Sequence, residues 1–401
     1  MFHLRWNQLR LEHRKIHLAM SVRPFFMQNV MQGYPLDFGD GFNDAPLTID
    51  EYQGKLYIGG YFTSYDGTAA NRIISLNLDG SINTDFNYGS GFNGYVIKIK
   101  VIDGKIWAMG TFTTYKLGTR NHAVCLNPDG SVNTDLDLGT GFNGTVQDVC
   151  VMDGYYHFGG NFATFNGTTH KYIVRMNSSG TVDEGDSGYP FHSGTGSYNL
   201  TATVTCLATD GTNLFVGGGG SVSGHGANIF ALLSTGRFST TFVTGSGFNG
   251  APNYLFHLGD FLYCCGPAST YNGSSCPLGF LYLYKDGSLP SQGFANFGGG
   301  TGTRRMIMSG TNYVLVGDFS TYDGDSYGKI IGLHMFYETP EATFNGNAGI
   351  GFYKGMTDLI EVNGKIYVIG SGNVGYPNYY KTSTNYVYGI IRLYIDGKQD
   401  T

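Results

Sequence analysis

Apolar and polar residues alternate along short stretches of the chain, and glycine-containing turns separate these stretches. The clearest case is the stretch VIKIKV at residues 96–101, which is followed by Asp103-Gly104 and then by KIWAMGTF at residues 105–112. Alternation with a period of two predicts a half-buried β-strand, and an Asp-Gly pair between two such stretches is a strong hairpin signal. The pattern therefore predicts antiparallel hairpins and an all-β fold.

This pattern recurs about every fifty residues. The triplets at 41–43, 91–93 and 141–143 all read Gly-Phe-Asn, and weaker or equal copies follow at 196–199, 247–250, 298–300 and 351–352. A fixed period of this size is typical of repeat architectures, in which each unit is one small supersecondary element. The sequence contains seven such units.

Each unit predicts four antiparallel strands. After the hairpin around Asp103-Gly104, a second loop contains Asn-Gly or Asp-Gly, as at 66–67, 166–167, 272–273 and 323–324, and a third strand follows, as at residues 72–77. A further glycine turn, for example at Gly80 or Gly130, begins the fourth strand. Four-stranded units repeated radially bury both faces of every small sheet, which is how a β-propeller protects its edges.

A linear solenoid is the alternative, but it would need atypical capping repeats at both ends. The chain instead stops at Thr401, where the first unit continues into its fourth strand, and residues 35–39 resemble the missing piece. We therefore predict a seven-bladed β-propeller of four-stranded antiparallel blades over residues 35–401. Residues 35–39 are predicted to form the outermost strand of the last blade, and residues 1–34 a short N-terminal arm.

Composition and charge narrow the function classes. The chain has 63 glycines, 30 tyrosines and 28 phenylalanines but only 13% charged residues, which suits short strands joined by tight turns. Its net charge is −6, although residues 1–33 are basic, so the body carries the acidic excess. We expect no nucleic-acid binding, because phosphate contacts require clustered Lys and Arg. We also expect no membrane insertion, since no apolar run is long enough, and no Sec-type signal peptide.

The repeat resembles the delta-60 β-propeller repeats, which occur in tailed-bacteriophage tail and fibre proteins and in bacterial surface proteins. The motif has the form G-F-N-G, apolar strand, D-G-K, G-G-x-F-x-x-Y-x-G-T and R-I-x-x-L-N-x-D-G-S, and the resemblance covers residues 36–401. Blades one to three match closely. Blade four departs at residues 217–220 and blade six at residues 338–340. The resemblance implies architecture more than chemistry.

Candidate catalytic and metal-binding groups have simpler structural interpretations. The Asp-Gly-Ser stretches at 79–81 and 129–131 could surround a calcium ion, but Asp and Asn in such turns also bond their own backbone. Glu338 and Glu341 form the one close glutamate pair, in a stretch interrupted by Pro340, and we interpret them as solvated loop charges. The six cysteines show no zinc spacing and are expected to be small buried residues. We predict no catalytic residue, no metal site and no cofactor.

Two regions are candidates for recognition or docking. Two long loops contain residues suited to adaptable contacts with a sugar or a protein: Tyr376, Asn378, Tyr379, Tyr380, His192 and Tyr198. The arm interleaves apolar and basic residues and suits a docking helix with a shorter aromatic anchor, formed by Leu4, Leu11, Ile16, Phe25 and Phe26. Disorder of the arm, or a true start at Met20, remains the alternative.

These features favour a non-enzymatic virion structural protein of a tailed bacteriophage. We expect a tail or tail-fibre component, assembled in the host cytoplasm, that serves as an assembly platform or a host-surface reader. Its expected partners are other tail proteins, bound through the arm, and a glycan or protein of the host surface. A bacterial surface adhesin or carbohydrate-binding propeller is the first alternative, with an extracellular location. A glycan-active enzyme built on a propeller is the second.

Overall fold

The structure is a computed structural model of the whole chain. It describes the following residues: 36–187, 189–191, 200–220, 225–276, 279–290, 297–300, 302–335, 339–348, 352, 355–373 and 388–400.

Seven three-stranded antiparallel sheets, one for each sequence repeat, form the blades in the described part of the chain. In chain order, their strands are β1 (Pro46–Tyr52), β2 (Lys55–Gly60) and β5 (Ile73–Asn77); β6 (Val96–Ile102), β7 (Lys105–Gly110) and β10 (Ala123–Leu126); β11 (Thr145–Met152), β12 (Tyr155–Asn161) and β15 (Ile173–Met176); β16 (Val204–Thr209), β17 (Asn213–Gly218) and β18 (Ile229–Leu233); β19 (Tyr254–Leu258), β20 (Phe261–Gly266) and β23 (Gly279–Tyr284); β25 (Gly302–Ser309), β26 (Asn312–Asp318) and β29 (Ile330–His334); β30 (Met356–Val362), β31 (Lys365–Asn373) and β32 (Tyr388–Tyr394).

Short hairpins and one helix complete the described elements. The hairpins are β3 (Ser64–Tyr65) with β4 (Thr68–Ala69), β8 (Thr114–Tyr115) with β9 (Gly118–Thr119), β13 (Thr164–Phe165) with β14 (Thr168–Thr169), β21 (Thr270–Tyr271) with β22 (Ser274–Ser275), and β27 (Thr321–Tyr322) with β28 (Asp325–Ser326), the last joined by β24 (Phe297–Gly298). Helix α2 (Ala342–Ala348) lies in the sixth unit, where the sequence lacks the usual Asp-Gly turn.

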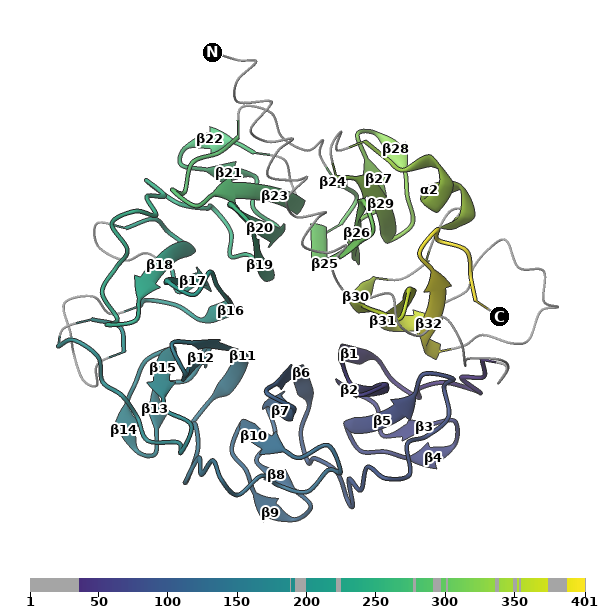
Figure 1. Cartoon of the computed structure of the whole chain (residues 1–401), viewed down its shortest axis with the longest axis horizontal. Helices are drawn as coiled ribbons and strands as arrows, with labels where there is room; N and C mark the ends of the chain where they lie inside the picture. Colours follow the sequence, from purple (N-terminus) through teal and green to yellow (C-terminus); the bar gives the residue numbers. More distant parts are fainter. Residues whose placement is uncertain are drawn as a thin grey trace.

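The sheets stand around a common axis like the blades of a fan (Figure 1). The first strand of each sheet is innermost, and the short hairpins lie toward the outer rim. Seven buried hydrophobic clusters fill the spaces between the sheets, and each cluster combines side chains of two neighbouring sheets. Each sheet is therefore buried on both faces, which explains why the alternating strands still contain many apolar residues.

Local turn chemistry accounts for the hairpin at the start of each unit. Asp103 and Gly104 both have positive φ, of 51° and 71°, as a two-residue turn matching the right-handed strand twist requires. The pairing of β6 with β7 then runs from Ile102 opposite Lys105 to Val96 opposite Gly110, with a bulge between Val96 and Lys98. The hairpin predicted from the Asp-Gly signal is present at this site.

The Gly-Phe-Asn motif holds the outer hairpin of the first, second, third and fifth blades. In the second unit, Asn93 Oδ1 accepts hydrogen bonds from the backbone N–H groups of Thr113 and Thr114, each at 2.9 Å. Tyr115 lies at the end of β8, and its hydroxyl donates to the carbonyl of Gly130 at 2.7 Å. The same asparagine contacts recur at Asn43, Asn143 and Asn249. The motif therefore has a structural role in satisfying backbone groups at the rim.

The fourth strand that we predicted for each blade is shorter than expected. Beyond the third strand, the pairing is a single bridge, as between Leu76 and Ile82 or between Leu126 and Val132. The chain then leaves its own sheet, and the N–H of Asn87 donates to the carbonyl of Asp129 in the next blade, at 2.8 Å. The outer segment thus connects two blades, which limits its pairing with either one.

The predicted pairing of residues 35–39 with the last sheet is wrong. Pro35 lies outside the described residues, and the N–H of Asp37 donates to the carbonyl of Asp79, in the first blade, at 3.1 Å. The outer edge of the last sheet pairs instead with the C-terminal residues, where the N–H of Asp400 donates to Arg392 O at 3.0 Å. The turn after β32 lets the chain return on its own sheet, so the edge is already occupied.

The first and last sheets are joined by side-chain packing. One buried cluster combines Phe38, Phe42 and Ile49 of the first unit with Val362 and Ile369 of the last. Figure 1 shows these two sheets side by side, as neighbours in the ring. The ends of the chain therefore meet through a hydrophobic interface of the same kind as those between the other blades.

No helix within the described part of the chain is long and apolar enough to cross a membrane.

Candidate functional site

The inner strands place one equivalent side chain from each blade around the axis. These side chains lie opposite the same position of the second strand in each sheet. They are Thr48, Lys98, Asp148, Cys206, Tyr254, Arg305 and Asp358. We call these residues and the polar groups bonded to them the axial belt.

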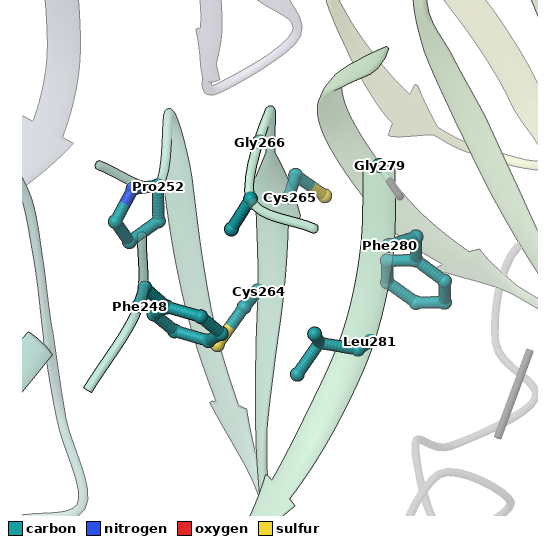
Figure 2. A pocket seen from close by; sticks show the side chains of 9 residues that line it. Phe248, Pro252, Cys264, Cys265, Gly266, Gly279, Phe280 and Leu281 are labelled. Carbon is teal, nitrogen blue, oxygen red and sulfur yellow. The ribbon is translucent and has the colours of Figure 1, made fainter. Parts of the chain in front are cut away.

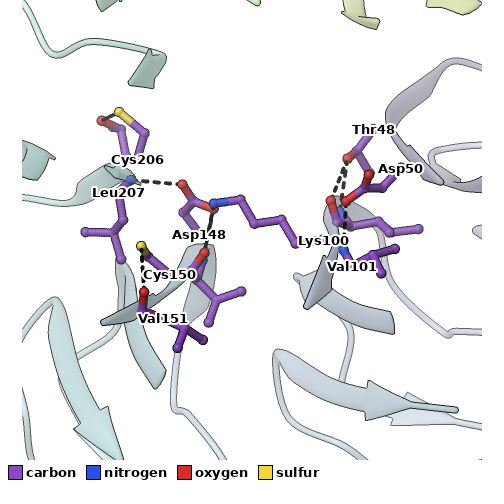
Figure 3. Close-up of polar contacts among 12 residues, drawn as sticks. Thr48, Asp50, Lys100, Val101, Asp148, Cys150, Val151, Cys206 and Leu207 are labelled. Atoms are coloured by element: carbon purple, nitrogen blue, oxygen red, sulfur yellow. Dashed lines mark hydrogen bonds and ion pairs between the residues drawn. The ribbon is translucent and has the colours of Figure 1, made fainter. Parts of the chain in front are cut away.

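Hydroxyl and carboxylate groups link the first blade to the second. The Thr48 hydroxyl accepts a hydrogen bond from the N–H of Ile99 at 3.0 Å, and Asp50 Oδ2 accepts one from the N–H of Val101 at 2.7 Å (Figure 3). Burial raises the pKa of Asp50, although hydrogen bonds from the backbone N–H groups of Val101 and Glu51 oppose the shift. The side chains of one inner strand thus accept hydrogen bonds from backbone N–H groups of the next inner strand.

An ion pair links the second blade to the third. Lys100 Nζ lies 2.6 Å from Asp148 Oδ1 and donates to the carbonyl of Val149 at 2.8 Å (Figure 3). Asp148 Oδ2 in turn accepts a hydrogen bond from the N–H of Leu207, in the fourth blade, at 2.9 Å. Burial alone would raise the pKa of Asp148, but the nearby lysine outweighs it, and the pKa is lowered.

From the fourth blade to the sixth, uncharged side chains make the hydrogen bonds of the axial belt. The Thr205 hydroxyl donates to the carbonyl of Pro252 at 2.6 Å, and Asn253 Nδ2 donates to the carbonyl of Thr303 at 3.3 Å. These bonds resemble the charged contacts, because a side chain in or beside one inner strand reaches the backbone of the neighbouring blade.

Between the sixth and seventh blades, charged side chains again make the contacts of the axial belt. The Arg305 guanidinium lies 4.2 Å from the Tyr254 ring centroid, and its Nε lies 3.0 Å from Asp358 Oδ1. Asp358 Oδ2 accepts a hydrogen bond from the N–H of Ile49, in the first blade, at 3.2 Å. With this contact, polar interactions connect every neighbouring pair of the seven sheets, including the last with the first.

Lys98 shows that side chains meet at the axis itself. Its Nζ, from the second blade, lies 5.8 Å from the ring centroid of Tyr254, in the fifth blade. These two blades are not neighbours in the ring (Figure 1). The contact with Tyr254 therefore takes the Lys98 side chain across the axis. Burial lowers the pKa of Lys98. At this level a side chain of the belt therefore crosses the axis.

A small apolar pocket lies in the fifth blade (Figure 2). Its cavity volume is about 10 Å³, roughly the space of one water molecule and far below the roughly 300 Å³ at which small-molecule sites begin. Two thiols border it, and burial raises the pKa of Cys264 well above its usual range and that of Cys265 to about 12. Such thiols are poor nucleophiles. The lining residues are Phe248, Pro252, Cys264, Cys265, Gly266, Ala268, Gly279, Phe280 and Leu281.

Comparison with known proteins agrees with this geometry. Residues 54–86, 103–135 and 153–185 match the family described as "Domain of unknown function (DUF5122) beta-propeller". The chain is a repeat β-propeller. The matched segments make up about a quarter of the chain and lie in the first three blades.

Solved structures resemble the propeller at low sequence identity. The computationally designed Ika8 protein is 12% identical, with a TM-score of 0.51, and the match covers 91% of this chain and 98% of that protein. The WD40 β-propeller domain of Doa1 is 14% identical, with a TM-score of 0.42, and the match covers 71% of this chain and 94% of that domain. No curated protein matches the chain. The likeness to Ika8 concerns the fold alone.

The recognition and docking residues predicted from the sequence lie outside the described residues of the propeller. This applies to the loop residues His192, Tyr198, Tyr376, Asn378, Tyr379 and Tyr380 and to the arm residues Leu4, Leu11, Ile16, Phe25 and Phe26. The residues of the axial belt were not singled out from the sequence. A signal was present, because Lys98, Lys100 and Asp148 interrupt inner strands that are otherwise largely apolar or neutral.

The other polar candidates of the propeller have structural roles. Asp129 Oδ1 accepts hydrogen bonds from the N–H and hydroxyl of Ser131, at 2.9 and 2.6 Å, and these bonds lower its pKa. Glu341 accepts bonds from the N–H groups of Thr343 and Phe344 at the start of α2, whereas Glu338 lies outside the described residues. Within the described ranges, no three His, Cys, Asp or Glu side chains gather to hold a metal ion.

All six cysteines are free. Five are buried, as expected for small apolar residues, and Cys150 is partly exposed.

Proposed function

We propose that this β-propeller is a non-enzymatic virion protein of a tailed bacteriophage, a tail or tail-fibre component that acts as an assembly platform or a host-surface reader. The axial belt is the observation that carries the non-enzymatic part. Propeller enzymes need placed acids, bases or metal ligands near a cavity, but the charged groups here bond one another or the backbone of a neighbouring blade. Their chemistry is used to hold the ring together.

The phage assignment rests on the resemblance of the repeats and on the composition. Many glycine turns, few charges and two-sided burial of every sheet suit a rigid particle component. In this proposal the protein is assembled in the host cytoplasm, and its arm binds other tail proteins.

The test is to locate the chain in particles. Virions from a lysate of the source culture would be purified, analysed by mass spectrometry and labelled with gold-conjugated antibody against residues 36–401. Label on the tails, with the chain present in stoichiometric amounts, is expected. Label confined to bacterial envelopes would overturn the phage assignment and favour the adhesin.

A bacterial surface adhesin or carbohydrate-binding propeller is the second candidate. It is favoured by an exposed aromatic pair, Tyr61 and Tyr95, on neighbouring blades, with exposed fractions of 37% and 44%. A glycan-active enzyme is the third candidate. Release of reducing sugar from a polysaccharide by the pure protein would distinguish this enzyme from the virion protein and from the adhesin.

A further inference from the structure

The most exposed pair of touching aromatic side chains in the described residues lies between the first and second blades. Tyr61 follows β2, and Tyr95 precedes β6. Their ring centroids are 4.5 Å apart, and the ring planes meet at 65°. The two rings therefore form an open corner rather than a closed stack, and each keeps part of its face in contact with solvent.

An arginine completes this corner. The Arg72 guanidinium lies 5.1 Å from the Tyr95 ring centroid, and its Nη1 donates to the carbonyls of Tyr61 and Phe62. Its Nη2 and Nε make no hydrogen bond within the described part of the chain. The site thus combines two apolar ring faces with the N–H donors of two guanidinium nitrogens, held in one plane.

The backbone holds the corner rigid. The N–H of Tyr61 donates to Ala45 O at 2.8 Å, and the N–H of Tyr95 donates to the Thr111 hydroxyl at 3.0 Å. The N–H of Thr111 returns a bond to Tyr95 O at 3.0 Å. Because the backbone of both tyrosines is fixed before any ligand arrives, little backbone ordering entropy would be lost on binding.

The repeat itself serves as an internal control. At the position of Tyr61, the second and third blades have Thr111 and Asn161, and at the position of Tyr95, the first and third have Ala45 and Thr145. The fold therefore does not need an aromatic residue at either place. Exposing two rings costs hydrophobic free energy, so a structural role does not explain why both tyrosines occur here together.

The size and charge of the corner decide which ligand it suits. The two partly exposed rings offer on the order of 150–200 Å², far less than the roughly 800 Å² per partner of a stable protein interface. The net charge of the chain is −6, which disfavours a polyanion such as nucleic acid. A small neutral ligand with one apolar face and several hydroxyl groups fits both limits.

We propose that Tyr61, Tyr95 and Arg72 form a binding subsite for a neutral pyranose sugar. The C–H face of the sugar packs on a tyrosine ring, and the Arg72 donors bond its hydroxyl oxygens. The proposal deepens the recognition role under "Proposed function" and rests on it, and the site is distinct from the loops predicted from the sequence.

The test measures binding of the methyl glycosides of glucose, galactose and N-acetylglucosamine to the full chain by saturation-transfer NMR. We expect binding to at least one glycoside with a Kd on the order of 1 mM. Y95A should lose the signal, Y95F should keep it because the ring face remains, and R72Q should weaken binding by about tenfold. Y394A is the matched control, since Tyr394 is 40% exposed in the seventh blade, and it should bind as the wild type does.

Absence of transfer from all three glycosides, or equal transfer with Y61A and Y95A, would overturn the sugar site. The melting temperature of each variant separates loss of binding from loss of folding. If the chain is found on phage tails but binds no sugar, the platform role stands and the subsite falls. If it binds sugar but is absent from particles, the phage assignment falls and the subsite stands.

Discussion

At the scale of single residues, the propeller shows how one position changes character between blades. The middle strand places Tyr57, Trp107 and Phe215 at equivalent buried positions, but the third blade has His157 there, fully buried. Burial, together with the charge of Arg175, lowers the pKa of His157 to about 4. The site selects for a large flat side chain, and the imidazole is accommodated in its neutral form.

His157 predicts a pH dependence of stability. Its pKa is about 4 in the folded chain and about 6.5 when unfolded, so the unfolded chain takes up the proton first as the pH falls. The histidine therefore contributes stability above pH 6.5 that is lost as the pH falls towards 4. Between pH 7 and pH 5 we expect a loss of about 2 kcal/mol in unfolding free energy. In H157F most of this loss should disappear, as urea titrations at the two pH values would measure.

An unchanged difference between pH 5 and pH 7 in H157F would show that other groups cause it. The variant must first be as stable as the wild type at pH 7, which is expected because Phe215 occupies the equivalent position in the fourth blade.

The Lys100–Asp148 pair allows a second test at this scale. D148N should cost about 3–5 kcal/mol, because it leaves the partly buried ammonium of Lys100 without its carboxylate while keeping an oxygen for the N–H of Leu207. The double variant K100M/D148N should recover most of this loss, since the uncompensated charge is gone. A double-mutant cycle from denaturant unfolding measures the coupling. If the two single losses simply add, the pair contributes no coupling.

At the scale of elements, the outer hairpins differ in how well the residues of their turns suit a backbone with positive φ. The turns at Asp66-Gly67 and Asn166-Gly167 have positive φ at both residues, and glycine occupies the second place. In the second blade, the same turn is Lys116-Leu117, with φ of 48° and 67°. Leu117 is 88% exposed. A branched apolar residue thus stands where the backbone favours glycine and where no packing compensates.

Replacing this leucine should stabilise the chain. L117G should raise the unfolding free energy by about 1 kcal/mol, because a non-glycine residue in the left-handed region costs that much. The reciprocal change, G67L, should cost about the same, since Gly67 has φ of 71° and open space around its Cα. Denaturant midpoints of the two variants measure both effects. A loss of stability in L117G would mean that Leu117 makes a contact that its exposure does not reveal.

At the scale of the whole molecule, the ring is closed by the same two devices that join its other blades. A hydrophobic cluster containing Phe38 and Ile369 fills the space between the first and last sheets. The axial belt crosses the same boundary through Asp358 and the N–H of Ile49. No strand exchange is needed in this arrangement, because each interface is complete once its side chains are packed.

Two matched phenylalanines test this closure. Phe38 lies in the cluster between the first and last sheets, and Phe86 lies in the cluster between the first and second; both are buried. If the ring is closed in solution, F38A and F86A should each lower the unfolding free energy by about 3–5 kcal/mol. A near-zero effect of F38A beside a large effect of F86A would show that the first and last blades separate.

Signals that act over a few residues were readable from the sequence. The Asp103-Gly104 turn, the alternating inner strands and the fifty-residue spacing predicted the hairpins, the repeat and the propeller, because turn geometry and strand alternation depend on adjacent residues. The absence of zinc spacing among the cysteines predicted that they are small buried residues, and five of the six are buried.

Only the tertiary structure decided what meets at the axis and at the blade boundaries. Lys98 and Tyr254 stand far apart in the sequence, yet they approach each other across the axis, and Asp358 reaches Ile49 from the other end of the chain. Tyr61 and Tyr95 become a pair only when two blades are set side by side. Such contacts depend on how the sheets twist and pack around the ring. No local pattern records that geometry, so the prediction for residues 35–39 was wrong, whereas the propeller was predicted correctly.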